Sequence, residues 1–165
     1  MRRWLTGMIA VSVSLLLIIS GSAFAVSQTV SDQRGDAPPR NDILRATYRN
    51  GVARLATRLV IDDVKSHGKA RLVISDKHRV VDYIATVKRH ANGNLERHLR
   101  VREGSLPSAP VRCHVRASWK PAKDIVAISV RHRCVHLKKR LFLRAAAGGA
   151  GRSVDWAPSV GLLRG

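Results

Sequence analysis

The sequence predicts an all-β protein, an antiparallel β-sandwich of the jelly-roll or Ig-like kind, with about eight short strands and one cross-strand disulfide. Apolar and polar residues alternate over many short runs, which is typical of strands that bury one face. Turn residues separate these runs at regular intervals. Both cysteines lie in runs of the same alternating kind, where they can face each other.

The first pair of runs, DILRATYRNGVARLATRLVI over residues 42–61, is divided by Asn50-Gly51. This dipeptide is a strong signal for a two-residue hairpin turn. With that turn, Ala46 faces Leu55 and Tyr48 faces Ala53 on the apolar side of the hairpin. The opposite side carries a set of basic side chains, Arg45, Arg49, Arg54 and Arg58.

Three further runs predict strands over residues 70–75, 80–90 and 95–103. The link between the last two, ANGN, allows two registers. A two-residue turn places Val87 opposite His98, whereas a three-residue loop with Gly93 left-handed places Ala85 opposite Leu99. We expect the second register, because it pairs apolar residues with each other and opposite charges with each other.

Residues 111–135, VRCHVRASWKPAKDIVAISVRHRCV, contain the only two cysteines of the chain. If Cys113 faces Cys134 around a turn near residues 121–124, Trp119 faces Ile128 and the apolar residues of both runs share one side. Directly opposed strand residues lie close enough for a disulfide. In an oxidising compartment, paired cysteines are more common than catalytic or metal-bound ones. We therefore expect a hairpin closed by a Cys113–Cys134 disulfide.

The run after Cys134 has two interpretations. Leu141, Leu143 and Ala145 alternate as a strand would, but the residue types also favour a helix that could end at Gly148. A strand is favoured because the run is short and follows hairpins. The remaining tail is expected to be a loop whose Trp156 packs on the sheet.

The N-terminus predicts export. Arg2 and Arg3 precede an apolar run that ends in Ala23-Phe24-Ala25, the pattern of a cleaved secretory signal peptide. The alternative is an uncleaved membrane anchor, but the apolar run is shorter than the ~20 residues that span a bilayer. We therefore expect a secreted or extracellular, envelope-associated protein without a membrane span after cleavage. The expected parts are a signal peptide over 1–25, a flexible segment over 26–41, the sandwich over 42–147 and a Gly-rich tail over 148–165.

Three stretches together resemble a group of small exported β-sandwich proteins from actinobacteria. They are DQRGD…DILRATYRNGVARLATRLVIDDV, CHVRASWKPAKDIVAISVRHRC and VDWAP. This resemblance implies fold and export but no chemistry. The opening D-x-x-G-D…D-I, formed by Asp32, Gly35, Asp36, Asp42 and Ile43, is also similar to the start of calcium-binding β-sandwich modules attached to carbohydrate-active enzymes.

Asp32, Asp36 and Asp42 are the candidate metal ligands, because Ca²⁺ takes six to eight oxygen ligands and these carboxylates surround one loop. The favoured interpretation is nevertheless that they are solvated loop residues, so we expect no cofactor. Calcium is the only cofactor that the sequence suggests. The seven histidines are scattered over both faces of the predicted strands, so we expect no zinc site.

The strongest functional feature is positive charge. The chain has 30 Lys and Arg against 11 Asp and Glu, a formal net charge of +19. Such a surface attracts polyanions, and arginine binds phosphates and carboxylates through two hydrogen bonds. The alternative is a solvated basic surface without a ligand. The candidate polyanion-binding residues are Arg45, Arg49, Arg54, Arg58, Arg112, Arg116 and Lys120.

The expected partner is an anionic cell-envelope polymer or an acidic glycan. Aromatic residues are only 4% of the chain, which argues against specific binding of single-stranded nucleic acid, since that needs stacking platforms. No spacing indicates a catalytic triad or a glycosidase carboxylate pair, so we expect no enzyme. The alternatives are a carbohydrate- or calcium-binding accessory module and, less favoured, an extracellular hydrolase. The sequence does not define the oligomeric state.

Overall fold

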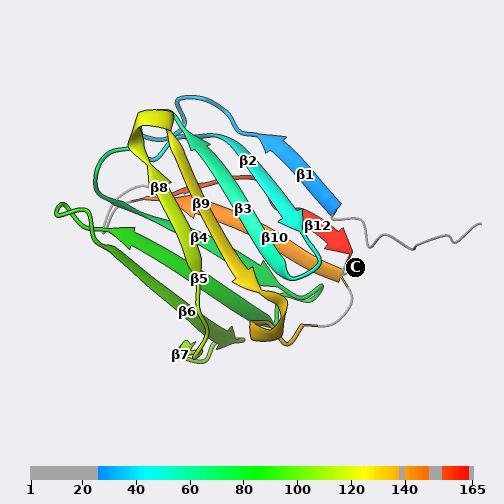
Figure 1. The fold of residues 1–165 in the computed structure, drawn as a ribbon. Helices are drawn as coiled ribbons and strands as arrows, with labels where there is room; N and C mark the ends of the chain where they lie inside the picture. Colours follow the sequence, from blue (N-terminus) through cyan, green and yellow to red (C-terminus); the bar gives the residue numbers. More distant parts are fainter. Residues whose placement is uncertain (1–25, 138–139, 149–153, 164–165) are drawn as a thin grey trace, which may run out of the picture.

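Two antiparallel sheets face each other across an apolar interior (Figure 1). The computed structural model describes residues 26–137, 140–148 and 154–163, so the expected signal peptide over 1–25 lies outside the described residues. One sheet has five strands in the order β1 (Val26–Ser31), β2 (Ile43–Asn50), β3 (Arg54–Ile61), β9 (Ile125–Arg131) and β8 (Arg116–Lys120). The all-β sandwich is confirmed.

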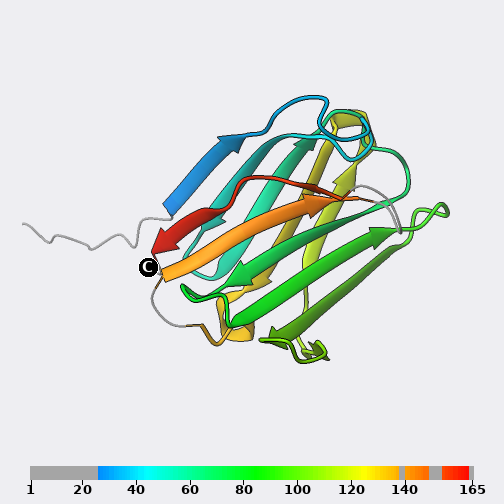
Figure 2. The ribbon, with the colours of Figure 1, turned by 180° about the vertical axis from the view of Figure 1, so that it is seen from behind.

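The second sheet lies behind the first and is seen from its own side in Figure 2. Its order is β11 (Asp155–Trp156), β10 (Arg140–Ala147), β4 (Gly68–Ser75), β5 (Val81–Arg89), β6 (Leu95–Glu103) and β7 (Ala109–Pro110), and β12 (Val160–Leu163) also pairs with β10. Two 3₁₀ helices, η1 (Pro121–Lys123) and η2 (His132–Cys134), follow β8 and β9. No helix of the described residues is long and apolar enough to cross a membrane.

The described residues form twelve strands, more than the eight expected. The expected boundaries of 42–147 are too narrow, because β1 pairs along β2 and both β11 and β12 pair along β10. Residues 26–31 are therefore a strand, where a flexible segment was expected. Their polar sequence gave no apolar alternation, but a polar strand suits a sheet edge, where it covers unpaired backbone groups of its neighbour.

The β2–β3 hairpin has a different register from the one expected. Tyr48 lies opposite Thr57, and the turn is centred on Val52 and Ala53, where Gly51 N–H donates to the Arg54 carbonyl at 3.0 Å. Asn50 is not a turn residue, because its buried side chain donates to the Leu163 carbonyl of β12. The shift in register is an even number of residues, so the paired strand residues keep their expected faces, whereas Ala53, expected on the apolar side, lies exposed in the turn.

The β5–β6 hairpin is confirmed in the expected register. Ala85 lies opposite Leu99 and Lys88 opposite Glu96. Gly93 has a φ of +85°, the left-handed conformation that the three-residue loop requires.

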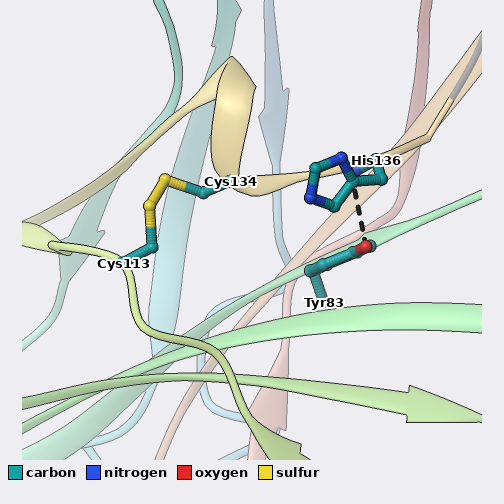
Figure 3. The surroundings of a disulfide bond; sticks show 4 residues. All are labelled: Tyr83, Cys113, Cys134 and His136. Atoms are coloured by element: carbon teal, nitrogen blue, oxygen red, sulfur yellow. Dashed lines mark hydrogen bonds between the residues drawn. A yellow bond between two sulfur atoms is a disulfide. The ribbon is translucent and has the colours of Figure 1, made fainter.

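The Cys113–Cys134 disulfide is confirmed, with a Cα–Cα distance of 5.9 Å (Figure 3). The register of the β8–β9 hairpin differs from the expected one, since Trp119 lies opposite Val126 and not Ile128. Cys113 precedes β8, and Cys134 lies in η2 after β9 has ended. A 3₁₀ helix rises only about 2.0 Å per residue, so η2 shortens the chain and brings Cys134 level with Cys113.

Residues 140–147 form β10, which confirms the strand interpretation over the helix. Beside it, Tyr48 of β2 is fully buried and joins the two sheets. Its hydroxyl accepts a hydrogen bond from Ala145 N–H of β10 at 3.0 Å and donates to the Pro158 carbonyl at 3.2 Å. Burial raises the pKa of Tyr48 from 10.0 to about 12.

Candidate polyanion-binding trough

The outer face of the five-stranded sheet carries three rows of side chains, defined by the register of its strands. In strand order from β1 to β8, the Arg49 row consists of Ser27, Arg49, Ala56, Ser129 and Arg116. The Arg58 row consists of Thr29, Thr47, Arg58, Ala127 and Ser118. The Arg45 row consists of Ser31, Arg45, Val60, Ile125 and Lys120. Small side chains occupy β3 and β9 in the Arg49 row, while arginines stand on β2 and β8. In the Arg49 row, long side chains therefore stand on either side of two short ones, which leaves a depression between them.

An open cavity of about 750 Å³ lies over the first two rows, and we call it the trough. Its arginines are Arg49, Arg58 and Arg116, and its hydroxyl-bearing residues are Ser27, Thr47, Thr57, Ser118 and Ser129. Arg49 and Arg116 stand three strands apart, about 14 Å at the usual strand spacing of about 4.8 Å. The lining combines guanidinium and hydroxyl groups with small apolar residues, and it contains no carboxylate, imidazole or aromatic ring.

Within the described part of the chain, the trough arginines have no acidic partner. None of the ion pairs between described residues involves Arg49, Arg58 or Arg116, although acidic residues elsewhere pair with Arg34, Lys65 and Arg102. The face therefore has a concentrated positive charge that an anionic ligand would neutralise.

Arg54 is the first residue of β3, two positions before Ala56 of the Arg49 row, and it lies opposite Arg131 of β9. Its Nε donates to Ser129 Oγ at 3.1 Å, and its Nη2 is buried without a hydrogen-bond acceptor in the described part of the chain. Burial lowers the pKa of Arg54, and the nearby charges of Arg116 and Arg131 lower it further.

The structure brings together most of the predicted polyanion-binding residues. Arg45, Arg49, Arg58, Arg116 and Lys120 share the outer face of one sheet, with Arg54 partly buried beside them. Arg112 does not join a row, because it lies in the segment before β8, although it is exposed. Sequence reasoning did not identify the hydroxyls of β1, which come from a segment expected to be a flexible loop.

The structure brings two of the three predicted metal ligands, Asp36 and Asp42, together with Asp155, whereas Asp32 is not part of this group. Asp36, Asp42 and Asp155 each offer a carboxylate oxygen no more than 4.8 Å from the other two. Asp155 starts β11, in the tail that was expected to be a loop. Burial raises the pKa of Asp155, and the carboxylates of Asp32 and Asp36 raise it further. Burial also raises the pKa of Asp32 itself.

Four of the described histidines make local contacts, and two of these share one partner. His90 and His98 hydrogen-bond the two oxygens of Glu96, at 2.9 and 2.6 Å. His132 Nε2 donates to the Gly51 carbonyl at 2.7 Å, which anchors η2 to the β2–β3 turn. His136 contributes its backbone N–H to the Tyr83 hydroxyl beside the disulfide (Figure 3).

A second cavity of about 390 Å³ lies on the outer face of the other sheet, and it contains the aromatic residues that the trough lacks. Phe142 and Trp156 line it together with Arg71, Arg102 and Arg144. The Arg144 guanidinium lies 4.2 Å from the centre of the Trp156 ring, so it covers one face of the indole.

Comparison with known proteins adds no assignment, because no family model and no curated protein matches this sequence.

Proposed function

We propose that the protein is an exported, non-catalytic β-sandwich that binds an anionic glycopolymer of the cell envelope along the trough. The proposal rests on three arginines that form no ion pair with any described residue and that line a cavity with hydroxyl groups on one sheet face. Guanidinium groups bind carboxylates and phosphates, while serine and threonine hydroxyls bind sugar or polyol hydroxyls. An acidic glycan and a polyol phosphate such as teichoic acid both combine these two kinds of group.

Two features favour this ligand over other polyanions. The trough lining has no aromatic side chain, and single-stranded nucleic acids gain much of their affinity from stacking on aromatic rings. The lining also has no carboxyl, imidazole or thiol group that could act as a general acid, base or activated nucleophile. We therefore propose binding and not catalysis.

The test is binding of the protein without its signal segment to four polymers: a polyuronate, a teichoic acid, neutral dextran and single-stranded DNA. We expect calorimetric binding to at least one of the two anionic glycopolymers, with an affinity that falls steeply as salt is added. The two glycopolymers distinguish carboxylate from phosphate as the recognised group. Equal affinity for dextran, salt-insensitive binding, or tighter binding to DNA than to both glycopolymers would contradict the proposal.

A further inference from the structure

Three carboxylates from distant parts of the sequence meet where the two sheets approach each other at β2 and β11. Asp36 lies in the β1–β2 loop, Asp42 directly precedes β2, and Asp155 begins β11 of the other sheet. One oxygen of each lies within 4.8 Å of the others. Asp42 is only 1% exposed and Asp155 only 7%, whereas Asp36 is exposed at the mouth of the cluster.

Backbone hydrogen bonds fix the two buried carboxylates. Asp42 Oδ2 accepts from Gly35 N–H at 2.8 Å, and Asp155 Oδ2 accepts from Ile43 N–H at 2.6 Å. The second oxygen of Asp42, Oδ1, is buried and has no hydrogen-bond partner among the described residues. Burying a carboxylate oxygen without a hydrogen-bond partner costs free energy. A cation bound to this oxygen would offset that cost.

That positive charge does not come from the described basic side chains. The ion pairs of the described residues leave out Asp36, Asp42 and Asp155, and the nearby Arg34 pairs with Asp62 at 2.5 Å. In a chain with almost three basic residues for each acidic one, three adjacent carboxylates without a cation are a costly arrangement.

We propose that Asp36, Asp42 and Asp155 bind one Ca²⁺ ion, which fastens the β1–β2 loop and β11 to the start of β2. The donors are all oxygens, as Ca²⁺ prefers, and oxygens bound to one Ca²⁺ at 2.3–2.6 Å lie at most about 5 Å apart. The exposed side of the cluster leaves room for water as further ligands. Asp155, absent from the ligand set that the sequence suggested, is the residue that makes the ion a link between the two sheets.

The consequence is a calcium-dependent attachment of the C-terminal segment. β11 pairs with β10 through only two residues, Asp155 and Trp156. The Asp155 side chain also accepts a hydrogen bond from Ile43 N–H, which links β11 to the first sheet. This inference does not rest on the trough, since none of the three carboxylates lines it.

The experiment is calorimetry and thermal unfolding of the chain without its signal segment, after chelation and dialysis. We expect one Ca²⁺ per chain, a melting temperature several degrees higher in CaCl₂ than in EGTA, and a smaller shift in MgCl₂. Asp36→Asn is the main variant because Asp36 is exposed. It should keep the melting temperature in EGTA and bind Ca²⁺ at least tenfold more weakly. Asp155→Asn should lose the calcium response as well.

Glu103→Gln, which removes one exposed carboxylate far along β6, is the matched control and should bind Ca²⁺ as the parent does. Absence of calorimetric binding together with equal melting temperatures in CaCl₂ and EGTA would overturn the proposal. Full Ca²⁺ affinity in both Asp36→Asn and Asp155→Asn would also overturn it, as would a stronger response to Mg²⁺ than to Ca²⁺. None of these outcomes depends on whether the trough binds a polymer.

Discussion

Arg49 of β2 and Arg116 of β8 stand in the same row of the five-stranded sheet, separated by Ala56 and Ser129. The two arginines are 67 positions apart in the sequence, and only the pairing of β3 with β9 aligns them. Because both intervening residues are small, the guanidinium groups line a depression and not a ridge.

Filling the floor of the trough should block binding without changing charge. Ala127 lies on the floor of the Arg58 row, between Arg58 and Ser118. Ala127→Phe places a large side chain with good strand propensity there. We expect affinity for the anionic glycopolymer to fall roughly tenfold, with little change in melting temperature, because the outer face is not part of the core.

Val73→Phe is the matched control for this change, since Val73 lies on the outer face of the other sheet at β4 and lines only the second cavity. It should leave glycopolymer binding unchanged. Unaltered binding by Ala127→Phe would show that the polymer does not occupy the trough.

The disulfide should contribute substantially to stability. It joins residues 21 positions apart, and closing a loop of this size contributes about 3 kcal/mol on the chain-entropy model. The double variant Cys113→Ser/Cys134→Ser should lower the free energy of unfolding in urea by about that amount. The parent protein should show no reactive thiol in denaturant, and two reactive thiols there would contradict the disulfide.

Tyr48 should titrate far above an ordinary tyrosine. Its pKa is raised from 10.0 to about 12, so the folded state holds the phenol proton more tightly than the unfolded state does. This contribution to stability is complete below pH 10 and is lost as the pH rises toward 12. In a Tyr83→Phe background, absorbance of the phenolate should show no ionisation near pH 10 while the protein is folded.

The same background in denaturing urea provides the reference, where Tyr48 should ionise near pH 10. A midpoint near 10 in the folded protein would mean that Tyr48 is not the buried link between the sheets.

Local sequence signals predicted the faces of the strands well. In both hairpins with a wrong register, the error was an even number of residues, so the faces of the paired strand residues were assigned correctly. The β5–β6 register was also correct, because Gly93 and the Lys88–Glu96 pair give local information. The arginine-rich outer face could therefore be predicted from alternation alone.

Features that depend on distant residues could not be predicted. Asn50 remains in β2 because its side chain bonds to Leu163, 113 residues later, and no local pattern indicates this contact. The trough depends on the order of the strands, since Ser27 and Arg116 lie at opposite edges of one sheet. The place of Asp155 in the acidic cluster could not be predicted for the same reason, because no local pattern marks β11 within the Gly-rich tail.

The most direct test of the trough as a polyanion site is the salt dependence of glycopolymer affinity in two triple variants of equal net charge. Arg49→Gln/Arg58→Gln/Arg116→Gln removes the trough arginines, whereas Lys77→Gln/Lys88→Gln/Arg97→Gln removes three exposed charges of the other sheet and its β4–β5 turn. For the trough variant, we expect the slope of log affinity against log salt to decrease by about 2 to 3, since each neutralised contact contributes about 0.7–0.9. The control variant should keep nearly the parent slope, and equal slopes in the two variants would contradict a localised site.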